Sequence, residues 1–268
     1  MPGRRARDPF ERSLEEGTAL PVSGWDFSPV RGRWRDPGPT WSYRRRARVR
    51  LRRVVSALDL GTGGGELLAT LAPLPRRTFA TEGYPPNLAI ARRRLAPLGV
   101  RVLPIGSDLR IALPDASVEL VLDRHEAFDP REVRRVLAPG GAFLTQQVGA
   151  DDLAEIDRAF GLPPESPTNR LESARALADE IGAGGLEVRE FREARYRTEF
   201  LDLAAVVWFL RLAPWQVPGF SIHRDRAALR RIDRTIRRTG AFRPTAHRLL
   251  VVARRPPESG RSARERTL

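Results

Sequence analysis

The sequence predicts an α/β protein with a mostly parallel sheet and helices on both faces. From residue 54 onward, short apolar runs alternate with amphipathic helical stretches. This alternation is typical of βαβ units, whose strands run parallel. A glycine-rich turn follows the first strand, where such folds bind ligands. Seven runs fit strands of a single sheet: 54–60, 78–81, 100–105, 118–123, 142–148, 186–200 and 248–253.

The stretches between these runs have helical spacing. In the second one, Leu88, Ala91 and Leu95 fall on one face. The expected helices cover 41–53, 66–74, 87–98, 131–137, 151–160, 171–181, 201–213 and 226–238.

Three segments are expected along the chain. Residues 1–53 form a basic N-terminal extension, with the 41–53 helix and nearby aromatic residues as a lid. Residues 54–255 form the main domain, with a helical insert at about 201–238, and residues 256–268 form a disordered tail. Because residues 1–20 are polar and lack a periodic apolar pattern, we expect them to be disordered or loosely packed.

Composition excludes several classes of site. The 268-residue chain has no cysteine, which rules out disulfides, a cysteine-bearing zinc site and a catalytic thiolate. It has three histidines, His125, His223 and His247, and we expect no metal site built by the protein. No apolar run approaches the roughly 18 to 20 residues that span a bilayer, and the N-terminus lacks a secretory pattern. We therefore expect a soluble, cytoplasmic protein without a membrane partner; the sequence does not indicate its oligomeric state.

The net charge of +14 is unevenly distributed. All 47 basic residues are arginine, a bias typical of a GC-rich genome. Residues 1–56 contain 14 arginines and 6 acidic residues, and residues 222–268 contain 14 arginines and 4 acidic residues. Residues 57–221 contain 19 arginines and 23 acidic residues, so the middle of the chain is slightly acidic. Basic ends attract RNA or acidic ligands, but solvated tails have the same composition.

The glycine-rich turn runs Asp59-Leu60-Gly61-Thr62-Gly63-Gly64-Gly65-Glu66. A dinucleotide-binding turn requires Gly-x-Gly-x-x-Gly, and Glu66 occupies the third glycine position. No Gly-Lys-Ser/Thr follows, so the turn is not a P-loop. Its pattern is Asp-x-Gly-x-Gly-x-Gly, which lets the backbone approach a ligand closely.

This turn resembles the first motif of class I S-adenosylmethionine-dependent methyltransferases. Glu82, 17 residues past Gly65, matches the acidic residue that ends the family's second strand, and Ser107-Asp108-Leu109 matches the signature after strand three. Residues 113–121 and 134–141 resemble the approaches to strands four and five. Trp25-Asp26-Phe27-Ser28, 124–126 and 146–149 resemble a bacterial and actinobacterial subgroup of methyltransferase-like proteins.

The resemblance implies a Rossmann-like seven-stranded fold that binds S-adenosyl-L-methionine. It implies that Glu82 binds the ribose hydroxyls, that Tyr84 covers the adenine, and that Asp108 and the next amide contact the adenine ring. The cofactor-binding residues implied are Asp59, Gly61, Thr62, Gly63, Gly65, Glu82, Gly83, Tyr84, Asp108 and Leu109.

The candidate catalytic residues are Arg124, His125 and Glu126, which leave strand four at its carboxyl end. His125 is the candidate general base because its ordinary pKa lies near the working pH, and Glu126 would orient or replace it. Many family members use no base, so His125 is alternatively a plain pocket residue. Gln146 and Gln147 would orient an acceptor or simply bond at the strand end.

Three functions remain open. The acidic body and the aromatic insert favour methyl transfer to a small molecule, with Trp208, Phe209, Trp215 and Phe220 either lining the acceptor pocket or forming core. The basic termini favour an RNA methyltransferase. The third alternative is a cofactor-binding protein without catalysis.

Overall fold

The structure is a computed structural model that describes residues 8–163 and 171–257. It divides into two compact units. Unit 1 is drawn from Met1–Trp41, Val148–Glu172 and Glu193–Arg248, and unit 2 from Ser42–Gln147, Ser173–Arg192 and Leu249–Leu268. Most of the tail expected over 256–268 lies outside the described residues.

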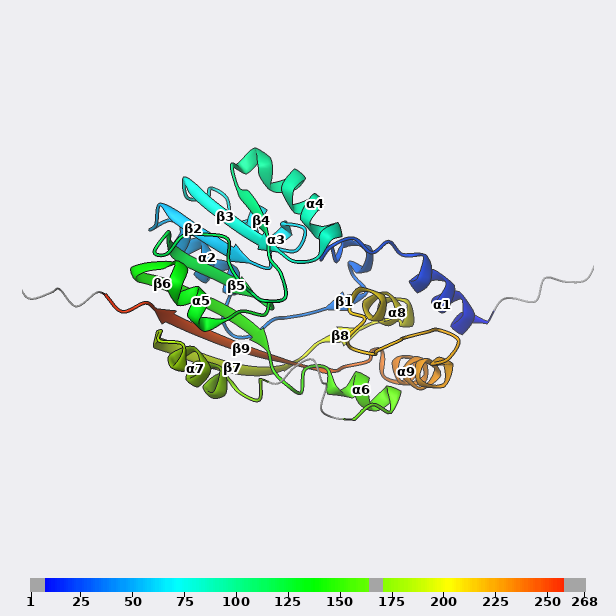
Figure 1. Ribbon diagram of the computed structural model, residues 1–268. Coiled ribbons are helices and arrows are strands. Elements are labelled where there is room, and N and C mark those ends of the chain that lie inside the picture. Colours follow the sequence, from blue (N-terminus) through cyan, green and yellow to red (C-terminus); the bar gives the residue numbers. More distant parts are fainter. Residues whose placement is uncertain (1–7, 164–170, 258–268) are drawn as a thin grey trace, which may run out of the picture. The chain divides into compact units, whose positions relative to one another are not determined.

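The main sheet has seven strands in the order β4-β3-β2-β5-β6-β9-β7, and this confirms the predicted α/β class (Figure 1). The pairs β2–β3, β2–β5, β3–β4 and β5–β6 are parallel. The strands are β2 (Ser56–Leu60), β3 (Arg77–Glu82), β4 (Arg101–Pro104), β5 (Val118–Arg124), β6 (Leu137–Val148), β7 (Glu187–Arg197) and β9 (Thr245–Arg254).

Strand β9 is the exception to the parallel pattern. Its backbone bonds pair Gly140 with Arg255 and Gly149 with His247, so the numbering rises on one strand as it falls on the other. Such pairing is antiparallel. All five residues of β2 are buried, as expected for a strand covered on both faces.

The register places polar residues side by side at one edge of the sheet. Leu60 pairs with Asp123, Glu82 with Pro104, and Arg124 with Gln146. Because these strands are parallel, the segments that leave β2, β3, β4 and β5 meet at the same edge.

Side-chain caps begin several helices of unit 2. Ser42 accepts a hydrogen bond from the amide of Arg45 (3.2 Å), and Asp129 accepts one from Arg131 (2.8 Å). These caps satisfy amides that the first helical turn leaves unpaired. The helices are α2 (Tyr43–Leu51), α3 (Glu66–Ala69), α4 (Pro85–Leu95) with the 3₁₀ turn η2 (Ala96–Leu98), α5 (Pro130–Val136) and α7 (Ala174–Ala183).

Unit 1 is built around α8 (Leu203–Leu212), in which every residue except Arg211 is buried. Helix α1 (Pro9–Ala19) packs closely on it: a Cβ on Gly17 would lie 2.6 Å from the Ala204 carbonyl oxygen. The remaining elements of unit 1 are η1 (Ser28–Val30), β1 (Trp34–Arg35), α6 (Ala154–Phe160), β8 (Glu199–Phe200) and α9 (Arg226–Thr239).

The aromatic residues expected in the insert divide between core and surface. Trp208 and Phe209 are buried in the hydrophobic core of unit 1, so they form core rather than a pocket lining. Phe220 packs on Phe160 with ring centroids 6.0 Å apart. Trp215 is exposed and contacts Trp25 at 5.7 Å.

Other expectations were wrong in detail. Within the stretch expected to be loose, residues 9–19 form α1, because Asp8 caps a helix whose Phe10 and Leu14 reach the core. The helix expected over 66–74 ends at Ala69, and the strand expected over 186–200 is divided into β7 and β8.

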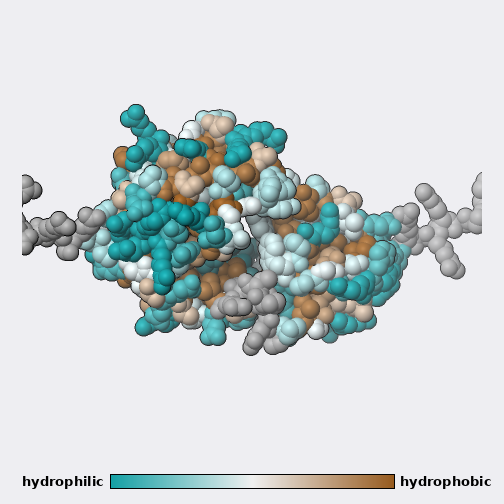
Figure 2. Space-filling model, in the orientation of Figure 1, coloured by the Kyte–Doolittle hydropathy of each residue, from teal (hydrophilic) through white to brown (hydrophobic). Residues whose placement is uncertain are grey.

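No helix in the described part of the chain is long and apolar enough to cross a membrane. The face seen in Figure 2 mixes hydrophilic and apolar residues, with a hydrophilic patch where α5 lies. Exposed Arg131 and Arg134 belong to that helix.

Candidate active site

The glycine-rich turn after β2 adopts backbone conformations that favour glycine. Gly61, Gly63 and Gly65 have φ values of 58°, 62° and 82°. Between them the amide of Thr62 donates to the carbonyl of Thr81 (2.8 Å), which ties the turn to β3. Side chains at these glycines would be strained, so the turn keeps a bare backbone surface.

Glu82 ends β3 next to this turn. Its carboxylate accepts a hydrogen bond from the Tyr84 amide (2.7 Å). Burial raises the pKa of Glu82, and the amides of Tyr84, Gly63 and Gly83 partly oppose this rise. A buried carboxylate near the glycine turn retains acceptor capacity for hydroxyl donors.

The segment after β4 lies beside Glu82, since the amide of Ile105 donates to the Glu82 carbonyl (3.3 Å). Asp108 in this segment is exposed and accepts from the Arg110 amide (3.2 Å), and Leu109 has a φ of 56°. Tyr84 is 61% exposed at the start of α4. The polar residues predicted after β3 and β4 therefore border one region.

Asp123 forms a polar network at the end of β5. Its carboxylate accepts hydrogen bonds from the Thr145 hydroxyl (2.9 Å), the Gln147 amide group (2.8 Å) and the backbone amide of Glu126 (3.1 Å). Burial nevertheless raises its pKa well above the ordinary value, and the charges of Glu126 and Asp59 raise it further. The protonated form of Asp123 is thereby favoured.

Asp59 is the second buried carboxyl group at this edge. Burial raises its pKa to about 7, while the Thr62 hydroxyl and the charge of Arg124 act in the opposite direction. The Thr62 hydroxyl is itself buried and makes no hydrogen bond of normal geometry. The site thus contains a buried carboxyl group close to neutrality and a buried hydroxyl without a well-formed partner.

Tyr43 and Thr145 are site residues that the sequence did not indicate. The Tyr43 side chain from α2 is buried, and burial together with the charges of Asp59 and Asp123 raises its pKa. Thr145 is buried in β6 and reaches Asp123. A signal was available only for Thr145, which lies directly before the two glutamines of the strand.

His125 follows β5 in a left-handed conformation, with a φ of 69°. Its amide donates to the Gln146 carbonyl (2.8 Å), and its ring Nε2 lies 3.2 Å from the amide nitrogen of Gln146. The direction of this hydrogen bond depends on the ring tautomer and on the orientation of the Gln146 amide group. Gln146 thus contacts His125, while Gln147 contacts Asp123.

Arg124 and Glu126 flank His125 and differ in environment. Arg124 is exposed, and its charge lowers the pKa of Asp59. Glu126 is partly buried, and burial raises its pKa. Its side chain lies directly on the glycine turn, since a Cβ on Gly61 would fall 2.3 Å from the Glu126 Oε2 atom.

Together these residues suit a ligand that carries positive charge. Asp59, Glu82, Asp123 and Glu126 each have a pKa raised by burial, so their ionised forms are disfavoured, and the charge of Arg124 opposes this only in part at Asp59. A bound cation would favour those ionised forms. Among residues 8–163 and 171–257, no group of three His, Cys, Asp or Glu side chains is arranged to hold a metal ion. Because the cluster favours positive charge and Glu82 can accept hydrogen bonds from hydroxyl groups, the chemistry of the site fits an organic cation with hydroxyl groups, such as S-adenosylmethionine.

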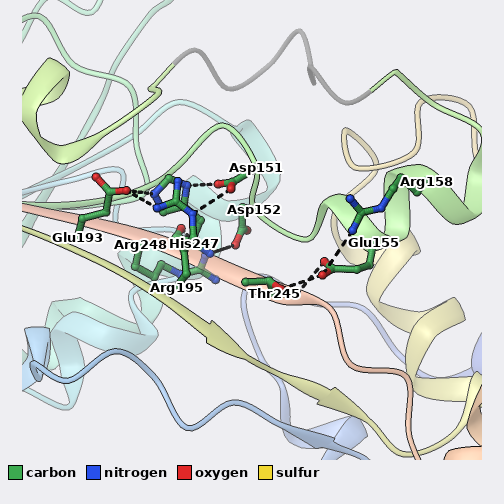
Figure 3. A network of polar contacts seen from close by, with 9 residues as sticks. All are labelled: Asp151, Asp152, Glu155, Arg158, Glu193, Arg195, Thr245, His247 and Arg248. Carbon is green, nitrogen blue, oxygen red and sulfur yellow. Dashed lines mark hydrogen bonds and ion pairs between the residues drawn. The ribbon is translucent and has the colours of Figure 1, made fainter.

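Unit 1 contains a separate polar network around His247 (Figure 3). The His247 ring is buried, contacts Asp151 through Nδ1, and lies 3.1 Å from Glu193 through Nε2. A Cβ on Gly149 would overlap this ring, which explains the glycine there. Arg195 bridges Asp151 and Glu193. Both ring nitrogens lie next to a carboxylate, so the network connects β7, β9 and the segment after β6.

Comparisons with known proteins show the same fold. A family model described as a methyltransferase domain matches residues 58–145. A candidate methyltransferase from Bacillus halodurans has a similar structure, with 17% identity and a TM-score of 0.55 over 78% of this chain and 98% of that one. The YcgJ protein from Bacillus subtilis is also similar, with 16% identity and a TM-score of 0.57 over 80% of this chain and 98% of that one. No curated protein sequence matches the chain.

The same fold also occurs outside methyl transfer. The [4+2]-cyclase SpnF is similar at 17% identity and a TM-score of 0.51, over 93% of this chain and 92% of that one. At such identities the likeness shows the fold alone, and function has to be argued from the site.

The raised pKa of Asp59 predicts how stability depends on pH. Between the unfolded value of 3.8 and the folded value of about 7, the folded state retains a proton that the unfolded state has lost. This contribution to stability is full at low pH and disappears as the pH rises through 7. The Tm of the wild type minus the Tm of Asp59→Asn should therefore decrease as the pH rises from 5 to 8. We expect a shift of at least about 2–4 °C, which corresponds to about 1 kcal/mol.

Thermal unfolding followed by circular dichroism at pH 5, 6, 7 and 8 measures this difference. Asp115→Asn is the control, because the Asp115 side chain is 78% exposed and should show no such trend. Parallel pH profiles for the wild type and Asp59→Asn would contradict the prediction.

Proposed function

We propose that this chain is a class I S-adenosylmethionine-dependent methyltransferase whose site transfers the methyl group to a small molecule; residues 58–145 match a family model described as a methyltransferase domain. When bound, the cofactor supplies a methyl group on a positively charged sulfur. The observation that carries this proposal is the set of buried carboxyl groups beside the glycine turn, whose pKa values burial raises.

Each part of the site has a proposed role toward the cofactor. Glu82 accepts hydrogen bonds from the ribose hydroxyls, and Tyr84 covers the adenine. Asp108 and the Leu109 amide bind the adenine edge. The remaining residues contact the methionyl part of the cofactor, which carries the sulfonium: Asp59, Gly61, Thr62, Gly63, Gly65 and Gly83.

His125 is the proposed proton acceptor for the incoming nucleophile. Its Nε2 atom lies 3.2 Å from the Gln146 side chain, so the ring has a defined orientation. In the tautomer protonated on Nε2, which donates to the Gln146 amide group, Nδ1 is the acceptor nitrogen. Methyl transfer is an in-line displacement, in which alignment of the nucleophile is the enzyme's main contribution. Exposed Arg124 beside His125 would attract an acceptor that carries negative charge.

One observation favours RNA as a second candidate acceptor. The face of α9 opposite the core carries Arg231, Arg234 and Arg238, which line a surface hollow of about 390 Å³ with Thr235. None of the three arginines has an acidic partner in the described part of the chain. Other arginines of α9 do, such as Arg237 with Asp233 (2.7 Å). Spacings of three and four residues place the three on one side of the helix, where they would contact phosphates.

Label transfer from methyl-labelled S-adenosylmethionine tests the proposed function. The full chain is incubated with small-molecule and RNA fractions of a lysate, and we expect label in the small-molecule fraction. His125→Ala should lower the initial rate about 100-fold or more, in the range of general-base catalysis, with the cofactor Kd unchanged.

His223→Ala is the matched control, because His223 is an exposed histidine of unit 1 and should keep the wild-type rate. An undiminished rate in His125→Ala would end the proposed role of His125. Cofactor binding without transfer to either fraction would favour the third alternative, a binding protein without catalysis.

The RNA alternative makes a separate prediction. If α9 binds phosphates, replacing Arg231, Arg234 and Arg238 with glutamine should flatten the plot of log affinity against log salt by about 2, since each phosphate contact contributes about 0.7 on single strands. Fluorescence anisotropy with labelled RNA between 50 and 200 mM salt measures this slope.

The control variant replaces Arg92, Arg93 and Arg101, which are also exposed, and removes the same charge from unit 2. An equal change in both variants would mean that only net charge matters and would contradict a binding surface on α9.

A further inference from the structure

The four carboxyl groups of the site differ in how firmly they are held. Asp123 accepts three hydrogen bonds from separate residues, and Glu82 is fixed by the amide of Tyr84. The Glu126 carboxylate accepts from the amide of its own neighbour, Ala127 (3.0 Å). Glu126 and Glu82 have longer side chains than the two aspartates of the site. Glu126 is only partly buried.

The backbone of Glu126 is nevertheless firmly anchored. Its amide donates to Asp123 (3.1 Å), and its carbonyl accepts from the Gln147 amide group (2.9 Å). A fixed backbone with a side chain held only locally lets the carboxylate adjust its position without moving the strand. Glu126 is thus suited to follow a charge that arrives at the glycine turn.

Glu126 lies beside the glycine turn, where the cofactor would bind. The side chain packs against Gly61, the first glycine of the turn. The contact is so close that any side chain at residue 61 would collide with Glu126. Its charge raises the pKa values of Glu82 and Asp123, so it acts on the same small region as the rest of the cluster. The buried Thr62 hydroxyl, which lacks a well-formed hydrogen bond, belongs to the next residue of the turn.

Arg124 partly compensates Asp59, whereas other arginines of unit 2 form ion pairs with acidic residues outside this cluster. Arg94 pairs with Glu66, and Arg135 with Glu132 (2.8 Å). Arg46 pairs with Glu190 (2.8 Å). A cation supplied by the ligand would therefore stabilise the ionised form of Glu126.

We propose that Glu126 makes the site discriminate between the cationic cofactor and its neutral product. This inference rests on the proposed function. When a nucleophile takes the methyl group, its lone pair forms the new carbon bond, the carbon–sulfur pair remains on sulfur, and the positive charge of sulfur is lost. The amino group is common to cofactor and product. A carboxylate therefore binds the two with different affinity only if it interacts with the positive charge on sulfur. Glu126 then favours exchange of product for fresh cofactor.

Isothermal titration calorimetry with the full chain tests this role. The ligands are S-adenosylmethionine, S-adenosylhomocysteine and a stable analogue with an amine in place of the sulfonium. Glu126→Gln keeps the size of the side chain and removes its charge. We expect it to weaken the two cationic ligands about tenfold or more and to change the Kd of the neutral product less than twofold.

Asp115→Asn is the charge control, because it removes an exposed carboxylate of the same unit and should leave all three Kd values unchanged. Equal weakening of all three ligands by Glu126→Gln would overturn the proposal, since Glu126 would then contact the common amino group or shape the turn. Unchanged Kd values would overturn it as well. Failure of the proposed function is distinguishable, because label would then be absent from the small-molecule fraction whatever the three Kd values are, whereas failure of this inference changes only the pattern of Kd values.

Discussion

The site depends on the crowding of carboxyl groups at the edge of a parallel sheet. Register brings the ends of β2, β3 and β5 together, so Asp59, Glu82 and Asp123 share one region, and Glu126 lies on the glycine turn beside them. Burial raises the pKa of every member. This arrangement is unfavourable for the free protein at neutral pH and becomes favourable when a cation binds.

The rest of unit 2 holds these groups in place. Gln147 and Thr145 from β6 bind Asp123, and the turn after β2 is tied to Thr81 of β3. His125 keeps its left-handed conformation because its amide and its ring both contact Gln146. Adjacent strands therefore position the carboxylates and the histidine through direct hydrogen bonds, and this accounts for buried glutamines in an otherwise apolar strand.

The sequence predicted the fold well because its signal is local. Glycines at 61, 63 and 65 and an acidic residue at 82 indicate a turn and a strand end without any knowledge of distant contacts. Helix boundaries were less predictable, as α3 shows by ending at Ala69. Helix α1 was missed because its buried face consists only of Phe10, Leu14 and Gly17. Packing of this face against α8 stabilises the helix, and such packing cannot be read from the local sequence.

The site was predictable where it lies on a motif and unpredictable where it depends on packing. Tyr43 precedes the first strand of the sheet by more than ten residues, and nothing in its neighbourhood indicates that its hydroxyl group lies near Asp59 and Asp123. The contact between Glu126 and Gly61 depends on strand register in the same way. The role of Trp208 and Phe209 was likewise open, because an aromatic pair on a helix is compatible with a pocket lining and with a core. Their burial shows that they belong to the core.

Proton release on cofactor binding tests the central claim most directly. If a cation compensates the buried carboxyl groups, S-adenosylmethionine should lower their pKa values and release protons near pH 7, where Asp59 is close to half protonated. Calorimetric titration at pH 7 in buffers of different ionisation enthalpy measures the number released, and a repeat at pH 8.5 should give a smaller number. Binding without proton release at pH 7, or with proton uptake, would contradict the account.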